Sequence, residues 1–268
     1  MSNDLILCLA LDKSNGRGAQ ALARLMHASA RLNGWKKDFV VIHNRPESFF
    51  DHYKPRKTDY EIQLKHDWEG RFQSQGFKMQ LDTLVDLSER DRVMFCDIDT
   101  MFFDSPQLFF DASDVDISFA RETIPIVRKQ FNSCLSDKQM ESFARDGTLG
   151  INSGQFVIRN KKAVEVFQTW RETLTKDWER SNKEQDQGPF NRMIYSQKFS
   201  TEEFPKNYVL LPFGNRRPVD HWDAKLVHYC GWRGATKMRF ALQEFVGGAL
   251  IRGKDHADMA ERLIREAL

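Results

Sequence analysis

The chain has 268 residues, with 40 lysines and arginines against 38 aspartates and glutamates, which gives a formal net charge of +2. This length is enough for one compact α/β domain with a large apolar core, so a single domain over residues 1–268 is the simplest expectation. The near balance of charge gives no electrostatic reason to expect a nucleic-acid partner.

Strands and helices alternate in the first part of the chain. Leu5–Leu11 is a short apolar run followed by Asp-Lys-Ser-Asn-Gly, which is typical of a buried strand that ends in a loop. Apolar residues then recur at helical spacing over Ala19–Leu32, and Asn33-Gly34 ends this helix as a C-cap does. The next segments are expected to be strand, strand, helix and strand: Phe39–Ile42, Tyr60–Leu64, Phe77–Leu87 and Arg92–Cys96.

After Asp104 the pattern becomes less regular. Three further strands and two helices are predicted: strands Val115–Phe119, Gln155–Ile158 and Lys225–His228, and helices Lys161–Arg180 and Gln185–Tyr195. Residues 257–268 form a charged amphipathic segment, and we expect a C-terminal helical part over about 236–268 that packs on the domain. Peripheral contact of this segment with a membrane is the alternative.

The alternation of strands and helices indicates the fold class. It favours an α/β protein with a mostly parallel central sheet flanked by helices on both faces. Ligands of such sheets bind outside the carboxyl ends of the strands, so the residues that follow each strand are the first candidates for a site.

Neither the N-terminus nor the cysteines indicate an exported protein. Met1–Leu11 has no cationic start, and its apolar run is too short for a signal peptide; no later stretch approaches the roughly 20 apolar residues of a membrane span. The cysteines form no Cys-x-x-Cys pair and are typical of reduced thiols: Cys8, Cys96, Cys134 and Cys230. We therefore expect a cytoplasmic protein.

The sharpest chemical signal is the D-x-D triplet Asp97-Ile98-Asp99, which directly follows the apolar strand Arg92–Cys96. Two neighbouring carboxylates repel each other unless a cation lies between them. Their oxygen atoms suit a hard cation, Mn²⁺ or Mg²⁺, which would be shared with a substrate diphosphate. The competing interpretation is a turn held by Asx-type hydrogen bonds, because the triplet is short.

Further segments resemble the glycogenin and lipopolysaccharide galactosyltransferase group of retaining GT-A fold glycosyltransferases, from about Phe77 to Lys237. Lys78 begins a helix before the D-x-D strand, as a lysine near the donor diphosphate and sugar does in this group. Asn152-Ser153-Gly154 resembles the segment that opens a strand and reaches the donor sugar. On its own, Asn-Ser-Gly is equally typical of a turn.

Two later segments extend the resemblance. Asp186-Gln187 followed by Asn191 is similar to the group's aspartate-glutamine turn, which implies that Asp186 binds sugar hydroxyls and that Gln187 faces the anomeric carbon. His228 and Gly231 are similar to the late histidine motif, in which the imidazole completes the metal site and the glycine lets the backbone approach phosphate.

The chain departs from the group after Gly231. The group continues with lysine-proline-tryptophan, whereas here Lys237 comes later and neither proline nor tryptophan follows it. Lys237 is our expectation for the cation that holds the β-phosphate, and Arg233 is the alternative. The resemblance also implies that Asp12, in the loop after the first strand, binds the nucleoside.

The resemblance implies a metal-dependent hexosyltransferase. It would move a sugar from a UDP-sugar to a carbohydrate or other hydroxyl acceptor, with Mn²⁺ or Mg²⁺ as cofactor and with retention at the anomeric carbon. We favour attack from the face of the departing phosphate, because the Gln187 amide does not readily form a glycosyl ester. A covalent intermediate on Asp186 is the alternative.

Other functions are compatible with shorter patterns. Gly16-Arg17-Gly18-Ala19-Gln20-Ala21 fits a loose dinucleotide-binding pattern of NAD(P)-dependent oxidoreductases. The D-x-D triplet is also similar to the nucleophile motif of haloacid dehalogenase-type phosphatases, although Met101 stands where threonine or valine is usual. A non-catalytic module that binds a nucleotide sugar or a glycan is the remaining alternative.

Overall fold

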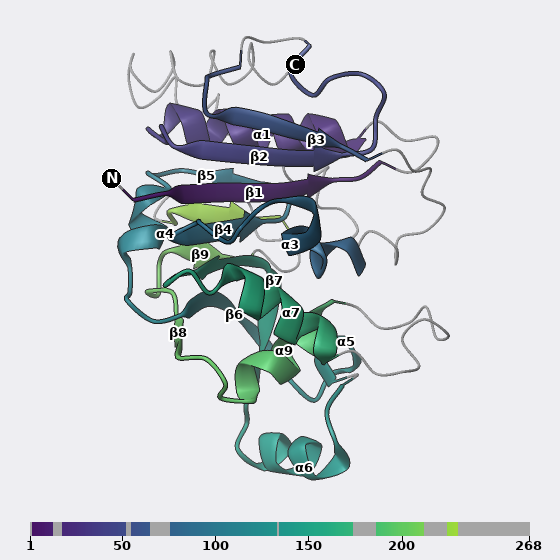
Figure 1. Cartoon of the computed structure of the whole chain (residues 1–268). Coiled ribbons are helices and arrows are strands. Elements are labelled where there is room, and N and C mark those ends of the chain that lie inside the picture. The colour runs from purple at the N-terminus through teal and green to yellow at the C-terminus, as the bar shows by residue number, and fades with distance from the viewer. Residues whose placement is uncertain are drawn as a thin grey trace. The chain divides into compact units, whose positions relative to one another are not determined.

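A computed structural model describes residues 2–12, 18–51, 55–64, 76–132, 134–173, 186–211 and 224–229 (Figure 1). The strands are β1 Asp4–Ala10, β2 Asp38–His43, β3 Asp59–Gln63, β4 Arg92–Cys96, β5 Thr100–Phe102, β6 Ile117–Pro125, β7 Leu149–Ile158, β8 Thr201–Glu203, β9 Val209–Leu210 and β10 Leu226–His228. The helices are α1 Gly18–Leu32, α3 Leu81–Leu84, α4 Gln107–Asp111, α5 Lys129–Asn132, α6 Asp137–Arg145, α7 Ala163–Glu172 and α9 Gln187–Tyr195.

Within these residues the strands form two sheets. The larger sheet has seven strands in the order β3-β2-β1-β4-β7-β6-β8, and the smaller has the order β5-β10-β9. The pairs β2–β3 and β6–β8 are parallel, whereas β6–β7 is antiparallel. The predicted mixed α/β architecture with a mostly parallel central sheet flanked by helices is confirmed. None of the described helices combines the length and the hydropathy needed to cross a bilayer.

The predicted helix over Phe77–Leu87 is too long. Helix α3 ends at Leu84, and Val85 has extended dihedral angles, with φ −125° and ψ 132°. The reason lies just beyond, where the Asp86 carboxylate accepts hydrogen bonds from the backbone N–H and the hydroxyl of Ser88. This local side-chain bonding offers the backbone an alternative to the helix.

The predicted strand Val115–Phe119 starts two residues before β6, which runs from Ile117 to Pro125, and the predicted strand Gln155–Ile158 is the last part of the longer β7. Strands β6 and β7 pair with Phe119 opposite Phe156 and Ala120 opposite Asn152, so residues 153–155 form a bulge in β7. The segment Asn152-Ser153-Gly154 therefore lies inside a strand and does not open one.

The predicted helices Lys161–Arg180 and Gln185–Tyr195 are shorter within the described residues. Helix α7 has its C-cap at Thr173, and α9 begins at Gln187. The remainder of the first predicted helix, up to Arg180, lies outside the described residues, as do residue 185 and the predicted helical part over 236–268.

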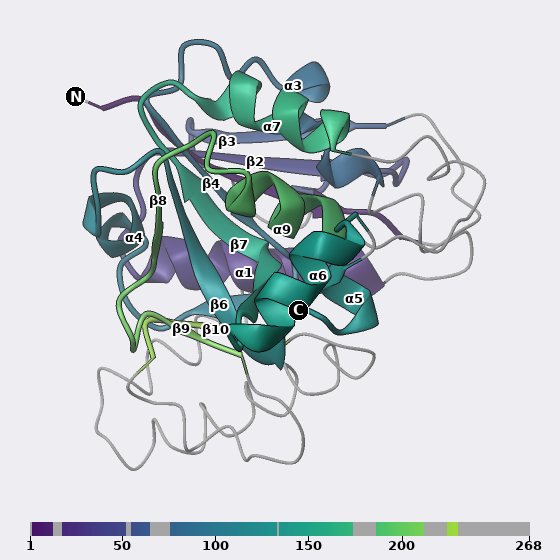
Figure 2. The ribbon, with the colours of Figure 1, turned by 90° about the horizontal axis from the view of Figure 1, so that it is seen from below.

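The chain divides into two compact units. Unit 1 comprises Met1–Leu5, Trp68–Phe95 and Ser113–Phe204; unit 2 comprises Ile6–Asp67, Cys96–Ala112 and Pro205–Leu268. In unit 1, α9 packs on β7 with α7 beside it (Figure 2). Aromatic side chains of these three elements and of β4 form much of this core: Phe95, Phe156, Phe167, Trp170 and Phe190. Burial of each such side chain contributes roughly 1.5–3 kcal/mol.

Unit 2 contains α1, which packs against β2 and β5. A buried ionic network joins α1 to β3, because Asp59 accepts hydrogen bonds from His27 and Arg31. Burial alone raises the pKa of Asp59, but His27, Arg31 and the backbone N–H of Arg56 outweigh it and bring the pKa to about 2. Burial lowers the pKa of His27, whose Nε2 lies 2.8 Å from Oδ1 of Asp59.

Candidate active site

The D-x-D triplet belongs to unit 2 and connects strands β4 and β5. Strand β4 ends at Cys96 and β5 begins at Thr100, so Asp97 and Asp99 stand at the start and the end of a three-residue connection. The buried residues on either side fix this connection, whereas both aspartates are partly exposed. The apolar strand therefore presents two carboxylates at its carboxyl end, as its sequence predicts.

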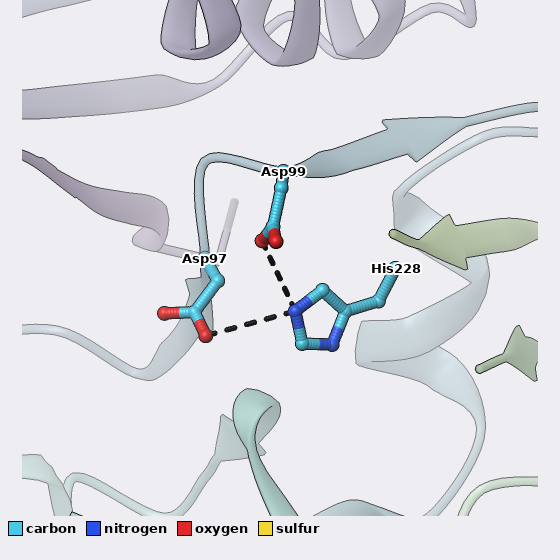
Figure 3. A group of neighbouring side chains, drawn as sticks. All are labelled: Asp97, Asp99 and His228. Atoms are coloured by element: carbon cyan, nitrogen blue, oxygen red, sulfur yellow. Dashed lines mark ion pairs between the residues drawn. The ribbon is translucent and has the colours of Figure 1, made fainter. Parts of the chain in front are cut away.

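Strand pairing brings His228 to the same place. Strand β10 runs antiparallel to β5 with His228 opposite Thr100, and the backbone N–H of Tyr229 donates to the carbonyl of Asp99 over 2.8 Å. The Nε2 atom of His228 lies 3.1 Å from Oδ1 of Asp99 and 3.7 Å from Oδ2 of Asp97 (Figure 3). Side chains that are far apart in the sequence thus point toward one another.

These three side chains have the donor set of a divalent metal site. Each offers one ligand atom, and the three atoms lie within 4.8 Å of one another. Two carboxylate oxygens and one imidazole nitrogen suit Mn²⁺ and also accommodate Mg²⁺. Among the described residues, this is the group of histidine, cysteine and acidic side chains that fits a metal ion. The predicted ligands Asp97, Asp99 and His228 are therefore brought together.

Two cysteines border this site without the properties of ligands. Burial raises the pKa of the Cys8 and Cys96 thiols, and the negative charge of Asp97 raises it further. Burial therefore favours the neutral thiol, which is a poorer metal ligand than the thiolate.

A second polar cluster lies in unit 1. The Lys78 ammonium donates to Oδ2 of Asp186 over 2.7 Å, and the Ser153 hydroxyl donates to the same oxygen over 2.6 Å. Both members of the ion pair are largely buried, and the Lys78 ammonium lies 5.1 Å from the ring centre of Phe95. Lys78, Ser153 and Asp186, which the sequence singles out as three separate segments, form one cluster.

Asn152 has a partner that sequence reasoning missed. Its Nδ2 donates to Oε1 of Glu122 over 2.6 Å, and its Oδ1 accepts the backbone N–H of Gly154 over 2.7 Å. Glu122 is buried in β6, at a position beyond the predicted end of that strand. A lone glutamate between arginine and threonine gives no sequence signal, and only the pairing of β6 with β7 reveals it.

Gln187 is the first residue of α9, where it is half-buried. The preceding residue, Asp186, is held in place by Trp170, whose indole N–H donates to the Asp186 backbone carbonyl over 3.2 Å. This contact fixes the start of α9 against α7. Gln187, predicted to face the anomeric carbon, and Asp186, predicted to bind sugar hydroxyls, thus both lie at the start of α9 in unit 1.

Asp12 is engaged in structural bonds. Its carboxylate accepts the backbone N–H of Ala19, in the first turn of α1, over 2.8 Å, and pairs with Arg45 over 3.3 Å. Its backbone N–H and carbonyl bond to the side chain of Asn44. Asp12 therefore ties the ends of β1 and β2 to α1. Gly231, Arg233 and Lys237, predicted to lie near phosphate, are outside the described residues.

Comparisons with known proteins identify the family and support the fold. Residues 87–238, more than half of the chain, match the family model described as nucleotide-diphospho-sugar transferase. The fold is similar to that of the galactosyltransferase LgtC in complex with donor and acceptor sugar analogs, with a TM-score of 0.57 and 13% identity over 88% of this chain and 95% of that chain. An active-site mutant of LgtC gives a TM-score of 0.59 and 14% identity over 90% and 95% of the two chains. No curated protein matches the sequence significantly.

The fold and the clustered acidic and imidazole side chains define a glycosyltransferase with the GT-A fold. The chain belongs to the nucleotide-diphospho-sugar transferase family. This assignment separates it from the oxidoreductases and phosphatases that shorter sequence patterns left open.

Proposed function

We propose that the protein transfers a hexose from a UDP-sugar to a hydroxyl of a carbohydrate acceptor, with Mn²⁺ or Mg²⁺ bound by Asp97, Asp99 and His228. The observation that carries the proposal is the convergence of these three ligand atoms within 4.8 Å. Similarity to LgtC, whose structure was determined with donor and acceptor sugar analogs, supports a sugar as acceptor.

The metal ligands have one task in this reaction. When bound, a divalent cation offsets the negative charge that develops on the diphosphate leaving group. Asp97 and Asp99 come from a short connection between strands, and His228 comes from a paired strand, so the ligands are held before substrate binds. A preorganised set of this kind loses little free energy to rearrangement.

The residues of unit 1 would bind the sugar. Lys78, Asn152, Ser153 and Asp186 supply hydrogen-bond donors and acceptors of the kind that sugar hydroxyls need. We assign Gln187 to the anomeric carbon, in line with the resemblance of its segment. Gly231 and Lys237 are assigned to the phosphates and Asp12 to the nucleoside, in line with the same resemblance.

The bonding of Asp186 favours one of the two routes to retention. Its Oδ2 accepts hydrogen bonds from both Lys78 and Ser153. A carboxylate oxygen that is paired with an ammonium group and hydrogen-bonded is a weakened nucleophile, because both interactions stabilise its negative charge. We therefore propose attack by the acceptor from the face of the departing phosphate, with Asp186 as a hydroxyl-binding group.

The test is a turnover assay with a panel of nucleotide sugars. Release of UDP is measured with a chelator, with Mn²⁺ and with Mg²⁺, in the presence and absence of simple sugar acceptors. We expect release with one or more UDP-hexoses only when a divalent cation is present, and NMR of the product should show the anomeric configuration of the donor. Metal-independent release, or release only from donors with another nucleoside, would contradict the proposal.

A further inference from the structure

Asn191 lies on α9 one turn after Gln187 and is completely buried. Its Oδ1 accepts the backbone N–H of Ile151 over 2.8 Å, and its Nδ2 donates to the carbonyl of the same residue over 2.9 Å. The Nδ2 also donates to the carbonyl of Gln187 over 2.7 Å. One side chain therefore binds both polar groups of one strand residue and the first carbonyl of a helix.

These bonds connect two segments that matter for the proposed reaction. Ile151 directly precedes Asn152 and Ser153 in β7, and Gln187 directly follows Asp186. The bulge at residues 153–155 interrupts the pairing of β7 with β6 at this point. The Asn191 amide holds the strand to the helix immediately beside this interruption.

Only an asparagine-like amide fits this arrangement. The side chain needs an acceptor for one N–H and two donors for two carbonyls, at the length that separates α9 from β7. Aspartate has the same shape but no donor when ionised. These groups are buried, so removal of the Asn191 amide would leave a backbone N–H or carbonyl without a hydrogen-bond partner. Because this is costly, the strand or the helix is expected to shift.

We propose that Asn191 is a positioning residue that fixes Gln187 relative to Asn152 and Ser153, an inference that rests on the proposed sugar transfer. The Ser153–Asp186 hydrogen bond of 2.6 Å is a second link between the same two segments. Asn191 supports that link from within the core of unit 1, whereas the metal ligands belong to unit 2. Its loss therefore impairs the chemical step more than binding of the nucleotide.

The experiment compares Asn191→Asp and Asn191→Ala with Tyr195→Phe. Tyr195 is the matched control because its hydroxyl also joins α9 to β7, donating to the Leu149 carbonyl over 2.8 Å, but at the far end of the helix. We expect kcat to fall on the order of ten- to a hundredfold in both Asn191 variants, as misplacement near a reacting centre does. The donor KM and the Kd for UDP with Mn²⁺ should change by less than about threefold, and Tyr195→Phe should retain kcat within about twofold.

Acidification provides a readout that general loss of structure does not give. In Asn191→Asp, protonation of the introduced carboxylate would restore one donor. The kcat of this variant relative to wild type should therefore rise as the pH falls, whereas that of Asn191→Ala should not. Circular dichroism at the assay temperature confirms that each variant is folded, and Asn191→Ala leaves room for a water that can bond to Ile151.

The outcomes separate the two proposals. Wild-type turnover with unchanged kcat in folded Asn191 variants would overturn the positioning role and leave the proposed function intact. An equal loss of kcat in Tyr195→Phe, or a loss confined to KM, would also overturn it. Absence of UDP-sugar turnover by the wild-type protein would overturn both.

Discussion

The two polar clusters of the molecule differ in how their charges are satisfied. In unit 1, Lys78, Ser153 and Asp186 bond to one another, so an ammonium group balances the carboxylate. In unit 2, two carboxylates share a single imidazole. A balanced, hydrogen-bonded cluster suits neutral hydroxyl groups, whereas an excess of negative charge at one point suits a cation. The difference supports the separate tasks that we propose for the two clusters: sugar recognition for the first and metal binding for the second.

Replacement of a metal ligand should have the largest effect. We expect Asp99→Ala to reduce metal-dependent UDP release by roughly a thousandfold or more, because loss of an electrostatic stabiliser of the transition state has costs of this order. Mn²⁺ should also raise the unfolding temperature of the wild-type protein but not that of the variant, since a ligand that binds only the folded state stabilises it. Coupled assays of UDP and thermal unfolding measure the two effects.

Asp104→Ala is the matched control for this variant. Asp104 belongs to the same unit and pairs with Lys225 over 2.7 Å, at a half-exposed position. Its loss should cost little stability and leave the response to Mn²⁺ intact. Full activity of Asp99→Ala would remove the basis for treating the two clusters as different in function.

Disruption of the unit 1 cluster should affect stability as well as activity. Lys78→Met leaves the buried Asp186 carboxylate without its ammonium partner, which has a cost of about 3–5 kcal/mol in folded proteins. Lys162→Met is the matched control, because Lys162 pairs with Glu165 over a similar 2.8 Å on the exposed surface of the same unit. The control should shift the urea unfolding midpoint far less than Lys78→Met does, because solvent screens an exposed ion pair.

The double variant Lys78→Met with Asp186→Leu sharpens this comparison. Removal of both buried charges should restore most of the stability, whereas activity should stay low because the hydroxyl-binding groups are lost. Recovery of activity together with stability would show that the cluster only supports the fold.

The unit 2 site could be predicted from sequence because its strongest signal is local. An apolar strand followed at once by two acidic residues places the carboxylates at the end where ligands bind, without any knowledge of distant contacts. His228 is found in the same way, as the end of a second strand. Its arrival beside Asp99 depends on the pairing of β10 with β5, which only the resemblance to known enzymes anticipated.

The unit 1 cluster was harder to predict from the sequence, because it depends on strand register. The Asn-Ser-Gly segment reads as a turn, and the bulge that keeps it inside β7 arises from pairing with β6, a strand well separated from it in the sequence. Glu122 has no local signal, since its importance lies in its partner Asn152. Asn191 was marked only by the resemblance, and its bonds to Ile151 become visible only in the structure. Asp12 was named only by the resemblance, which predicts a role at the nucleoside. The structure shows its carboxylate accepting the backbone N–H of Ala19 in the first turn of α1, and the nucleoside role stays a prediction.

Gln155 lies in unit 1 but, unlike the side chains of the Lys78–Ser153–Asp186 cluster, forms no hydrogen bond with the described residues. Its replacement is expected to have the smallest effect of those predicted here. Its side chain is fully buried in β7, and neither amide atom has a hydrogen-bond partner in the described part of the chain. Burial of an unsatisfied amide costs about 1–3 kcal/mol, so Gln155→Met, which keeps the length and removes the polar atoms, should raise the free energy of unfolding by about 1 kcal/mol. Asn152→Leu, on the same strand, removes an amide that is hydrogen-bonded to Glu122 and should lower the free energy of unfolding. Urea unfolding midpoints of the two variants should therefore move in opposite directions, and a loss of stability in Gln155→Met would show that this amide is satisfied within the folded protein.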